Sequence, residues 1–239
     1  MPQEIVICTS NQGKLREFAE ILDILYERSS LELDAEKYYF RNLRDLGIND
    51  FDPEETGSTY LENAKIKALA GAKRTGQFAL ADDSGIEVQA LNSEPGIYSG
   101  RYLRDPDKGV PGLLKEMEAK DEREVRYVCA LVLANPEGEI IFQTVAYWYG
   151  ELATEKHGEQ GFGFDPIVYP VLETNYDDQI HIEQEFKFPE SAFIDKSKTV
   201  AEMESKEKNS YSHRFKAMKK LLLFLLKKAD LAQDSANVI

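Results

Sequence analysis

The apolar positions in the first third of the chain change from the period of a β-strand to that of an α-helix. A β-rich run at residues 4–8 is followed by a polar turn and then by a helix predicted from Lys14 to Leu25. A second helix is predicted from about Ser58 to Arg74, because Gly76 supplies the glycine that commonly follows a helix. This part of the chain therefore predicts a strand, a polar turn and two helices.

A long hairpin is the clearest feature of the middle of the chain. Two β-rich runs, 125–134 and 139–152, are joined by Asn135-Pro136-Glu137-Gly138, and these residue types favour a turn. Another strand is predicted at 78–81, interrupted by polar residues and resumed at 86–88. A hairpin among alternating strands and helices predicts an α/β fold with a mixed sheet.

The end of the chain predicts a helix from about Ser205 to Ala229, preceded by an acidic segment at 171–198 that lacks a clear period. We expect that segment to be a surface insertion. The chain has 239 residues and no internal linker, so it is expected to form one domain over residues 1–239.

The composition narrows the possible partners. Hydrophobic residues make up 42% of the chain, enough for a substantial core, and 43 acidic against 29 basic residues give a net charge of −14. Phosphate backbones and anionic membranes repel such a chain, so neither nucleic acid nor a membrane surface is expected as a partner. A small anionic ligand in a local basic pocket stays compatible with this charge.

The cysteines and the hydropathy favour a reducing compartment. Cys8 and Cys129 lie in apolar runs and are predicted to be buried, unpaired strand residues. The longest apolar run, 221–226, is far shorter than the roughly 20 residues that cross a bilayer. With no signal peptide recognised at the start, the expected location is the cytoplasm.

The polar turn between the first strand and the first helix is a candidate phosphate site. Free N–H groups and a partial positive charge at a helix N-terminus suit phosphate oxygens, and a lysine adds a full charge. The alternative is an ordinary capped helix start, and the glycine spacing of a Walker loop is absent. The residues concerned are Thr9, Ser10, Asn11, Gln12, Gly13 and Lys14.

Acidic residues occur at two further candidate positions. Asp82 and Asp83 follow a predicted strand, and either carboxylate could bind Mg²⁺ or accept a proton from water. Their side chains are expected to point in different directions, and the alternative is an Asx-type turn. Glu55 lies before the second helix, where the helix dipole favours an acidic residue whatever its function. It would be a metal ligand only if it shared the metal with Asp83.

Two segments near the end could bind a flat ring. Glycines and aromatic residues in 161–166 suggest close backbone approach and stacking, with Asp165 as an acceptor for ring N–H groups. The alternative is a tight turn with core aromatics. Lys208, His213 and Arg214 are donors that could converge on a carbonyl or phosphate, although such a cluster is often a solvated face.

Taken together and in order, these segments resemble the non-canonical purine nucleoside triphosphate pyrophosphatases, also called the inosine triphosphate pyrophosphatase family. The resemblance runs nearly end to end, so the segments are more specific together than singly. It rests on Ser10-Asn11-x-x-Lys14, Glu55-Thr56-Gly57, Glu62-Asn63-Ala64, Ala81-Asp82-Asp83-Ser84-Gly85, Pro95-Gly96-Ile97-Tyr98-Ser99 with Arg101-Tyr102, Gly161 to Pro166, Glu207-Lys208 and Ser212-His213-Arg214.

The resemblance implies an elongated, two-lobed α/β fold with a long central mixed sheet flanked by helices and an active-site cleft between the lobes. It implies a Mg²⁺-dependent homodimeric enzyme that converts ITP, dITP and XTP to the monophosphate and pyrophosphate. Glu55 and Asp83 are the implied metal ligands, and Asp83 is also the proton acceptor. The implied substrate contacts are Thr9 to Lys14, Ser84, Phe162, Gly163, Phe164, Asp165, Lys208, His213 and Arg214.

Three other functions compete with this one. An enzyme of the same class could hydrolyse other modified nucleotides, including pyrimidines. A nucleotide sensor without turnover is disfavoured, because a pure binder needs neither Glu55 nor Asp83. A scaffold that uses the apolar C-terminal helix would show no stabilisation by nucleotide and Mg²⁺.

Overall fold

A six-stranded mixed sheet forms the centre of the protein in the computed structural model, which describes residues 3–28, 38–172, 186 and 194–236. The strand order is β2-β1-β3-β4-β5-β6, with β1 parallel to both of its neighbours and the remaining pairs antiparallel. The strands are β1 (Gln3–Ile7), β2 (Tyr38–Asn42), β3 (Phe78–Val88), β4 (Glu124–Ala134), β5 (Ile140–Leu152) and β6 (Val168–Pro170). The helices are α1 (Gln12–Arg28), α2 (Tyr60–Thr75), α3 (Ser99–Arg104), α4 (Gly109–Glu116), α5 (Ser205–Tyr211) and α6 (His213–Ala236).

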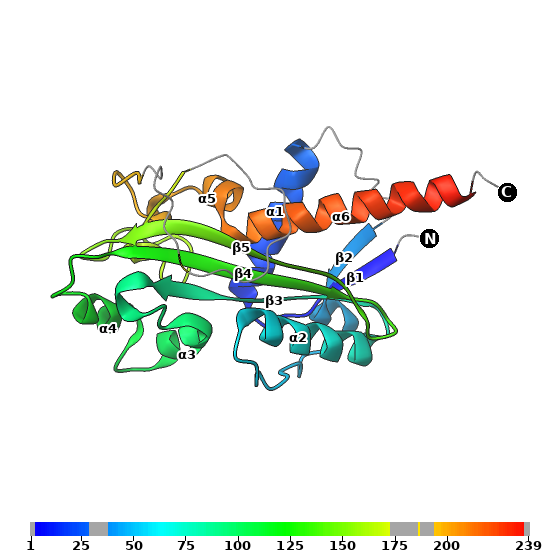
Figure 1. The fold of residues 1–239 in the computed structure, drawn as a ribbon, viewed down its shortest axis with the longest axis horizontal. Coiled ribbons are helices and arrows are strands. Elements are labelled where there is room, and N and C mark those ends of the chain that lie inside the picture. Colours follow the sequence, from blue (N-terminus) through cyan, green and yellow to red (C-terminus); the bar gives the residue numbers. More distant parts are fainter. Residues whose placement is uncertain (1–2, 29–37, 173–185, 187–193, 237–239) are drawn as a thin grey trace.

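Helices cover both faces of one half of the sheet (Figure 1). In β1 the side chains alternate, so that Ile5 and Ile7 pack with α1 and α6 on one face. Val6 packs with α2 on the other face. This period-2 alternation in a strand that is buried on both faces produces two separate apolar layers.

A third apolar cluster occupies the other half of the long strands. It joins the far ends of β3, β4 and β5 to α4 and to the segment around Ile167, with Trp148 buried at its centre. Figure 1 shows β3, β4 and β5 running the length of the molecule, with α2 near one end and α3 and α4 near the other. The long strands therefore connect two lobes, as the resemblance implied.

The structure confirms most of the predicted elements. The two N-terminal helices and the hairpin fall within a few residues of the predicted ranges. Gly76 adopts a left-handed φ of 66° and donates its N–H to the Ala72 carbonyl, which is the expected C-cap. Cys8 and Cys129 are buried and unpaired, as predicted.

The interruption predicted at residues 82–85 is wrong, because β3 continues from Phe78 to Val88. The polar residues pair with β4 throughout, and Asp82 and Asp83 lie opposite Leu131 and Ala130. Polar residues persist inside this strand because they line a cleft that supplies their partners. At Gly85 an added Cβ would come within 2.5 Å of Ser99 Oγ, so the strand requires glycine there.

The prediction of a single C-terminal helix is also wrong in part, because the chain breaks at Ser212 into α5 and α6. Ser212 is extended, with φ −62° and ψ 156°, and its hydroxyl accepts the backbone N–H of Phe215 at 3.1 Å. This is the geometry of a helix N-cap. The break places His213 and Arg214 in the first turn of α6.

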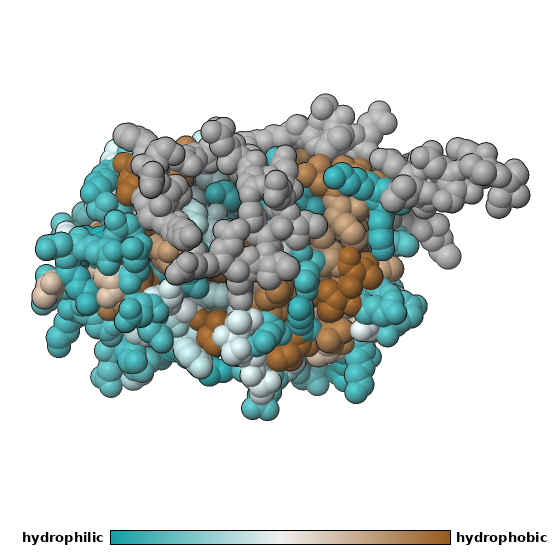
Figure 2. Space-filling model, in the orientation of Figure 1, coloured by the Kyte–Doolittle hydropathy of each residue, from teal (hydrophilic) through white to brown (hydrophobic). Residues whose placement is uncertain are grey.

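The predicted insertion at 171–198 lies mostly outside the described residues. Among the residues that the structure does describe, no helix is long and apolar enough to cross a bilayer. Figure 2 shows one face of the molecule, whose coloured surface is mainly hydrophilic, with apolar residues gathered over the right half of the view.

Candidate active site

A cleft of about 580 Å³ lies between the two lobes. Its walls come from the turn after β1, the loop before α2, the middle of β3, α3, residues 162–165 and the α5–α6 junction. Although the whole chain is strongly acidic, six cationic side chains line this cleft beside five carboxylates, and the places where cations gather suit an anionic ligand. The cations are Lys14, Lys67, Arg101, Arg104, Lys208 and Arg214.

The polar turn after β1 forms one wall. Cys8 donates its N–H to the Leu80 carbonyl at 2.7 Å, which ties the beginning of the turn to the first residues of β3. Asn11 Oδ1 accepts the backbone N–H groups of Gly13 and Lys14 at 2.9 and 3.2 Å, and so caps α1. The predicted phosphate turn is therefore a capped helix start that faces the cleft, and its two interpretations are compatible.

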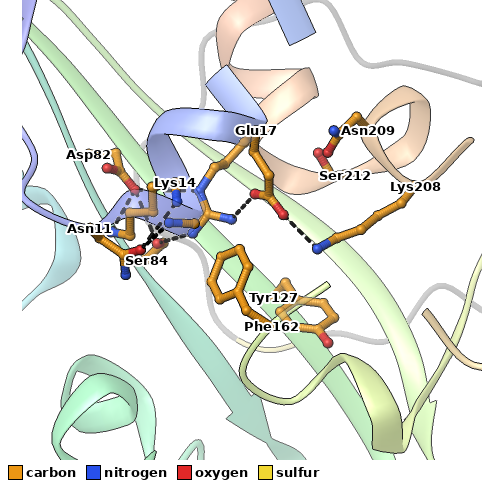
Figure 3. Close-up of polar contacts among 12 residues, drawn as sticks. Asn11, Lys14, Glu17, Asp82, Ser84, Tyr127, Phe162, Lys208, Asn209 and Ser212 are labelled. Carbon is orange, nitrogen blue, oxygen red and sulfur yellow. Dashed lines mark hydrogen bonds and ion pairs between the residues drawn. The ribbon is translucent and has the colours of Figure 1, made fainter. Parts of the chain in front are cut away.

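Asp82 is buried behind this turn and holds its cations in place. Its Oδ2 lies 2.8 Å from Lys14 Nζ and 3.7 Å from Arg214 Nε, and it accepts the Ser84 hydroxyl at 3.1 Å. Figure 3 shows Lys14, Asn11 and Ser84 gathered around it. Burial alone would raise the pKa of the Asp82 carboxyl, but the charges of Lys14 and Arg214 outweigh it and hold that pKa at about 2.

Asp83 points to the opposite face of β3, as predicted. Its Oδ1 accepts Lys67 Nζ at 2.9 Å, and its Oδ2 accepts the Asn63 side chain at 3.3 Å. Lys67 also donates to Glu55 Oε1 at 2.6 Å, so one ammonium bridges two carboxylates. Burial raises the pKa of Asp83, although Lys67 and Lys14 oppose that shift. A buried carboxylate with a raised pKa is suited to accept a proton.

The pair of Glu55 and Asp83 fits a divalent cation. Carboxylate oxygens are the ligands that Mg²⁺ prefers, and here two of them already share one positive charge at Lys67 Nζ. No group of three His, Cys, Asp or Glu side chains that could hold a metal occurs among the described residues. Mg²⁺ commonly binds through one or two carboxylates together with substrate phosphates, so two protein ligands suffice.

The loop at 161–165 forms the other end of the cleft. Gly161 and Gly163 have φ values of 72° and 68°, and a Cβ at Gly161 would come within 2.1 Å of Asp165 Oδ2. Asp165 folds back under the loop, where its Oδ2 accepts the N–H of Phe162 at 2.8 Å. The same oxygen accepts Lys208 Nζ at 2.7 Å. Asp165 thus shapes the loop and holds a cation, and both roles differ from direct acceptance of a ring N–H.

Glu17 connects this end of the cleft to Arg214. Its Oε1 accepts Lys208 Nζ at 2.5 Å (Figure 3). Its Oε2 accepts an Arg214 N–H, also at 2.5 Å. Arg214 also donates to the Ser84 hydroxyl at 2.7 Å. The Phe162 ring lies beside both cations, 4.9 Å from Lys208 Nζ and 5.5 Å from the Arg214 guanidinium carbon. A flat aromatic face and two donors therefore converge here.

His213 is buried in the first turn of α6. Its ring stacks on Tyr127 at 5.2 Å between centroids, and its Nδ1 has no hydrogen-bond partner among the described residues. Burial, together with the charges of Arg214 and Lys208, lowers the pKa of His213 well below its ordinary range. His213 is therefore neutral at neutral pH and contributes no charge.

The structure brings most of the predicted site residues together. The cleft is lined by Thr9, Ser10, Asn11, Lys14, Glu55, Asp83, Ser84, Phe162, Gly163, Phe164, Asp165, Lys208, His213 and Arg214. Two predicted residues do not line it. The Gln12 side chain accepts from Arg44 at 3.1 Å, and Gly13 lies under the ring of Phe162.

Sequence reasoning missed Lys67, Glu17 and Tyr127. Glu17 falls on the apolar stripe of the first helix together with Ile21 and Ile24, and a charged residue on such a stripe is a signal that it has a buried partner. Lys67 lies one helical turn after Asn63, so both side chains reach Asp83. Tyr127 carries no comparable signal, because aromatic residues are common in strands.

Comparisons with known proteins agree with this arrangement. A sequence model described as the Ham1 family matches residues 5–224. A dITP/XTP pyrophosphatase of Staphylococcus aureus (strain MW2) is 36% identical over 229 residues, covering 93% of this chain and 96% of the relative. A protein of the same name from Gloeobacter violaceus is 35% identical over 222 residues, covering 93% and 94% respectively.

A solved structure also matches the fold. The structure of the Staphylococcus aureus Ham1 protein aligns with a TM-score of 0.69 and 35% identity, covering 95% of this chain and 100% of that chain. The curled mixed sheet flanked by helices is therefore a shared architecture, and the predicted fold class is confirmed.

Proposed function

This chain belongs to the Ham1 family, and we propose that it hydrolyses the non-canonical purine nucleotides ITP, dITP and XTP to the monophosphate and pyrophosphate. Relatives named dITP/XTP pyrophosphatase support a hydrolase that acts on nucleoside triphosphates. The observation that carries the proposal is the buried Asp83 carboxylate, held by Lys67 within a cation-lined cleft.

The triphosphate binds at the turn after β1. Ser10 and Asn11 line the cleft at the N-terminus of α1, where the helix dipole favours negative charge, although Asn11 already caps the N–H groups of Gly13 and Lys14. Lys14 adds a positive charge that Asp82 orients from behind. Together these groups position the phosphates without requiring the glycine-rich loop that other nucleotide-binding folds use.

Asp83 accepts the proton of the attacking water. Water adds to the α-phosphorus as its proton passes to the Asp83 carboxylate, and the bond to the β-phosphate oxygen breaks with pyrophosphate as the leaving group. Glu55 and Asp83 would hold Mg²⁺, which when bound supplies charge neutralisation at the phosphates. Lys67 holds both carboxylates in place and carries a positive charge, since their charges keep its pKa raised against the opposing effect of burial.

The base lies at the Phe162 end of the cleft. The ring of Phe162 offers a stacking surface, and Lys208 and Arg214 are donors toward purine oxo groups. The network through Glu17 holds both cations in fixed positions, so their orientation does not depend on the ligand.

A panel of triphosphates with Mg²⁺ tests this proposal. Inosine monophosphate and pyrophosphate are expected to appear together from ITP, with little product from ATP or GTP. Release of orthophosphate with a nucleoside diphosphate would refute attack on the α-phosphorus. The family resemblance also supports a cytoplasmic homodimer, and light scattering measures the oligomeric state.

A further inference from the structure

Tyr127 lies in the middle of β4, where it lines the cleft beside Phe162 (Figure 3). Its ring stacks with that of His213, at 5.2 Å and 9°, and with that of Trp148, at 5.7 Å and 28°. Its hydroxyl donates to Asp165 Oδ1 at 3.0 Å. Burial and the charge of Asp165 raise the pKa of Tyr127 well above its ordinary value, so the hydroxyl remains a donor at neutral pH.

Asp165 has donors on both carboxylate oxygens. Phe162 N–H and Lys208 Nζ bind Oδ2, and the Tyr127 hydroxyl is the donor to Oδ1 among the described residues. The Asp165 residue is only 3% exposed. Without the hydroxyl, Oδ1 would be a buried acceptor beside the cleft with no partner, which is a costly arrangement that a ligand N–H could relieve.

Glu17 lies behind this end of the cleft, outside its lining, and each of its oxygens also accepts a donor. One oxygen accepts Lys208 and the other accepts Arg214. The two carboxylates therefore serve the protein's own donors, and the side chains that face a base here are donors and an aromatic ring. Tyr127 is the neutral member of this set, so removing its hydroxyl changes the acceptor at Asp165 without changing any charge.

We propose that Tyr127 is a specificity-determining residue, whose hydroxyl satisfies Asp165 Oδ1 from within the protein, so that no unpaired buried carboxylate oxygen is left to favour the exocyclic amino groups of adenine and guanine. Hypoxanthine and xanthine lack such an amino group. The ring N–H at position 1 is common to hypoxanthine and guanine, so it cannot distinguish them. An amino group buried without an acceptor is penalised, and sites with unmatched polar groups discriminate strongly between ligands. The inference rests on the proposed function and adds how that site excludes canonical purines.

The Tyr127→Phe variant tests this directly, because it keeps the ring and the stacking and removes only the donor. We expect the ratio of kcat/KM for GTP to that for ITP to rise roughly 10-fold or more, which is the range for one hydrogen bond to a charged group. The ratio of kcat/KM for ATP to that for ITP should also rise, by a factor that depends on how closely the 6-amino group of ATP approaches Asp165.

Tyr102→Phe is the matched control. Its hydroxyl also donates to a carboxylate, that of Glu116 at 3.0 Å, but this pair lies outside the cleft lining. The same loss of a hydroxyl there should leave the ratio of kcat/KM for GTP to that for ITP unaltered. An equal rise in both variants would overturn the assignment to Tyr127.

Two further results would overturn the inference. A folded Tyr127→Phe protein with an unchanged ratio, or with ITP and GTP falling together, would make Tyr127 a purely structural residue. If this variant does not fold, Tyr127→Leu is scored only on the ratio of kcat/KM for GTP to that for ITP, because it removes the stacked ring as well as the donor. If wild-type protein releases pyrophosphate from none of the nucleotides, the proposed function fails instead.

Discussion

Asp82 and Asp83 are adjacent in β3, and the same Asp→Asn change should have opposite consequences at the two positions. Asp83 faces Lys67 and Glu55 in the cleft, whereas Asp82 faces Lys14 and is buried. We expect Asp83→Asn to remove activity with little loss of stability. Asp82→Asn should lose stability, and any loss of activity should follow from misplaced cations.

The magnitudes follow from the two pKa shifts. The Asp82 pKa lies at about 2 rather than 3.8, so its ionised form stabilises the fold by about 2 kcal/mol. This contribution is present above pH 3.8 and is lost as the pH falls toward 2. The Asp83 pKa is raised, so ionisation of Asp83 opposes folding, and a neutral amide costs little stability. Loss of a general base lowers the rate by roughly 10²- to 10⁴-fold.

Two assays separate these effects. Pyrophosphate release from ITP at saturating Mg²⁺ measures turnover, and urea unfolding at pH 7 measures the free energy of unfolding. Near-normal turnover in Asp83→Asn would move the proton acceptor to another group. An Asp82→Asn protein as stable as wild type would refute the inference that Asp82 is held by its ion pairs.

Three other perturbations test separate parts of the site. Arg214→Ala should lower kcat/KM for ITP far more than for ATP, because Arg214 is the proposed donor to the 6-oxo group, and an equal fall in steady-state assays would exclude this role. Removal of divalent metal by a chelator should abolish pyrophosphate release until Mg²⁺ is restored. Calorimetry should find the melting temperature of the chelated protein nearly unchanged, since Lys67 already pairs the two carboxylates. Gly85→Ala should lower the free energy of unfolding by roughly 1–3 kcal/mol, because the added Cβ would approach the Gly96 carbonyl oxygen to 2.6 Å. An unchanged midpoint of urea unfolding would contradict this.

Local signals in the sequence predicted most of the secondary structure. The apolar stripe of the first helix, the glycine cap at Gly76 and the turn residues of the β4–β5 hairpin each act over a few residues. Such short-range preferences are readable without a fold. The motifs also identified the family, because several weak segments in a fixed order are specific together.

Long-range contacts decided the rest. The sequence predicted a break at Asp82 and Asp83, because carboxylates are unfavourable inside a strand when nothing pairs with them. In the folded protein Lys14 and Lys67 approach from different helices, Lys14 pairs with Asp82 and Lys67 with Asp83, and β3 therefore continues. Tyr127 is an ordinary strand residue by its local pattern, and only the fold places its hydroxyl on Asp165, 38 residues away. By itself the sequence determined which chemical groups are present and where the chain can turn. The tertiary structure decided which groups meet in the cleft, because burial and pairing depend on neighbours that are distant along the chain.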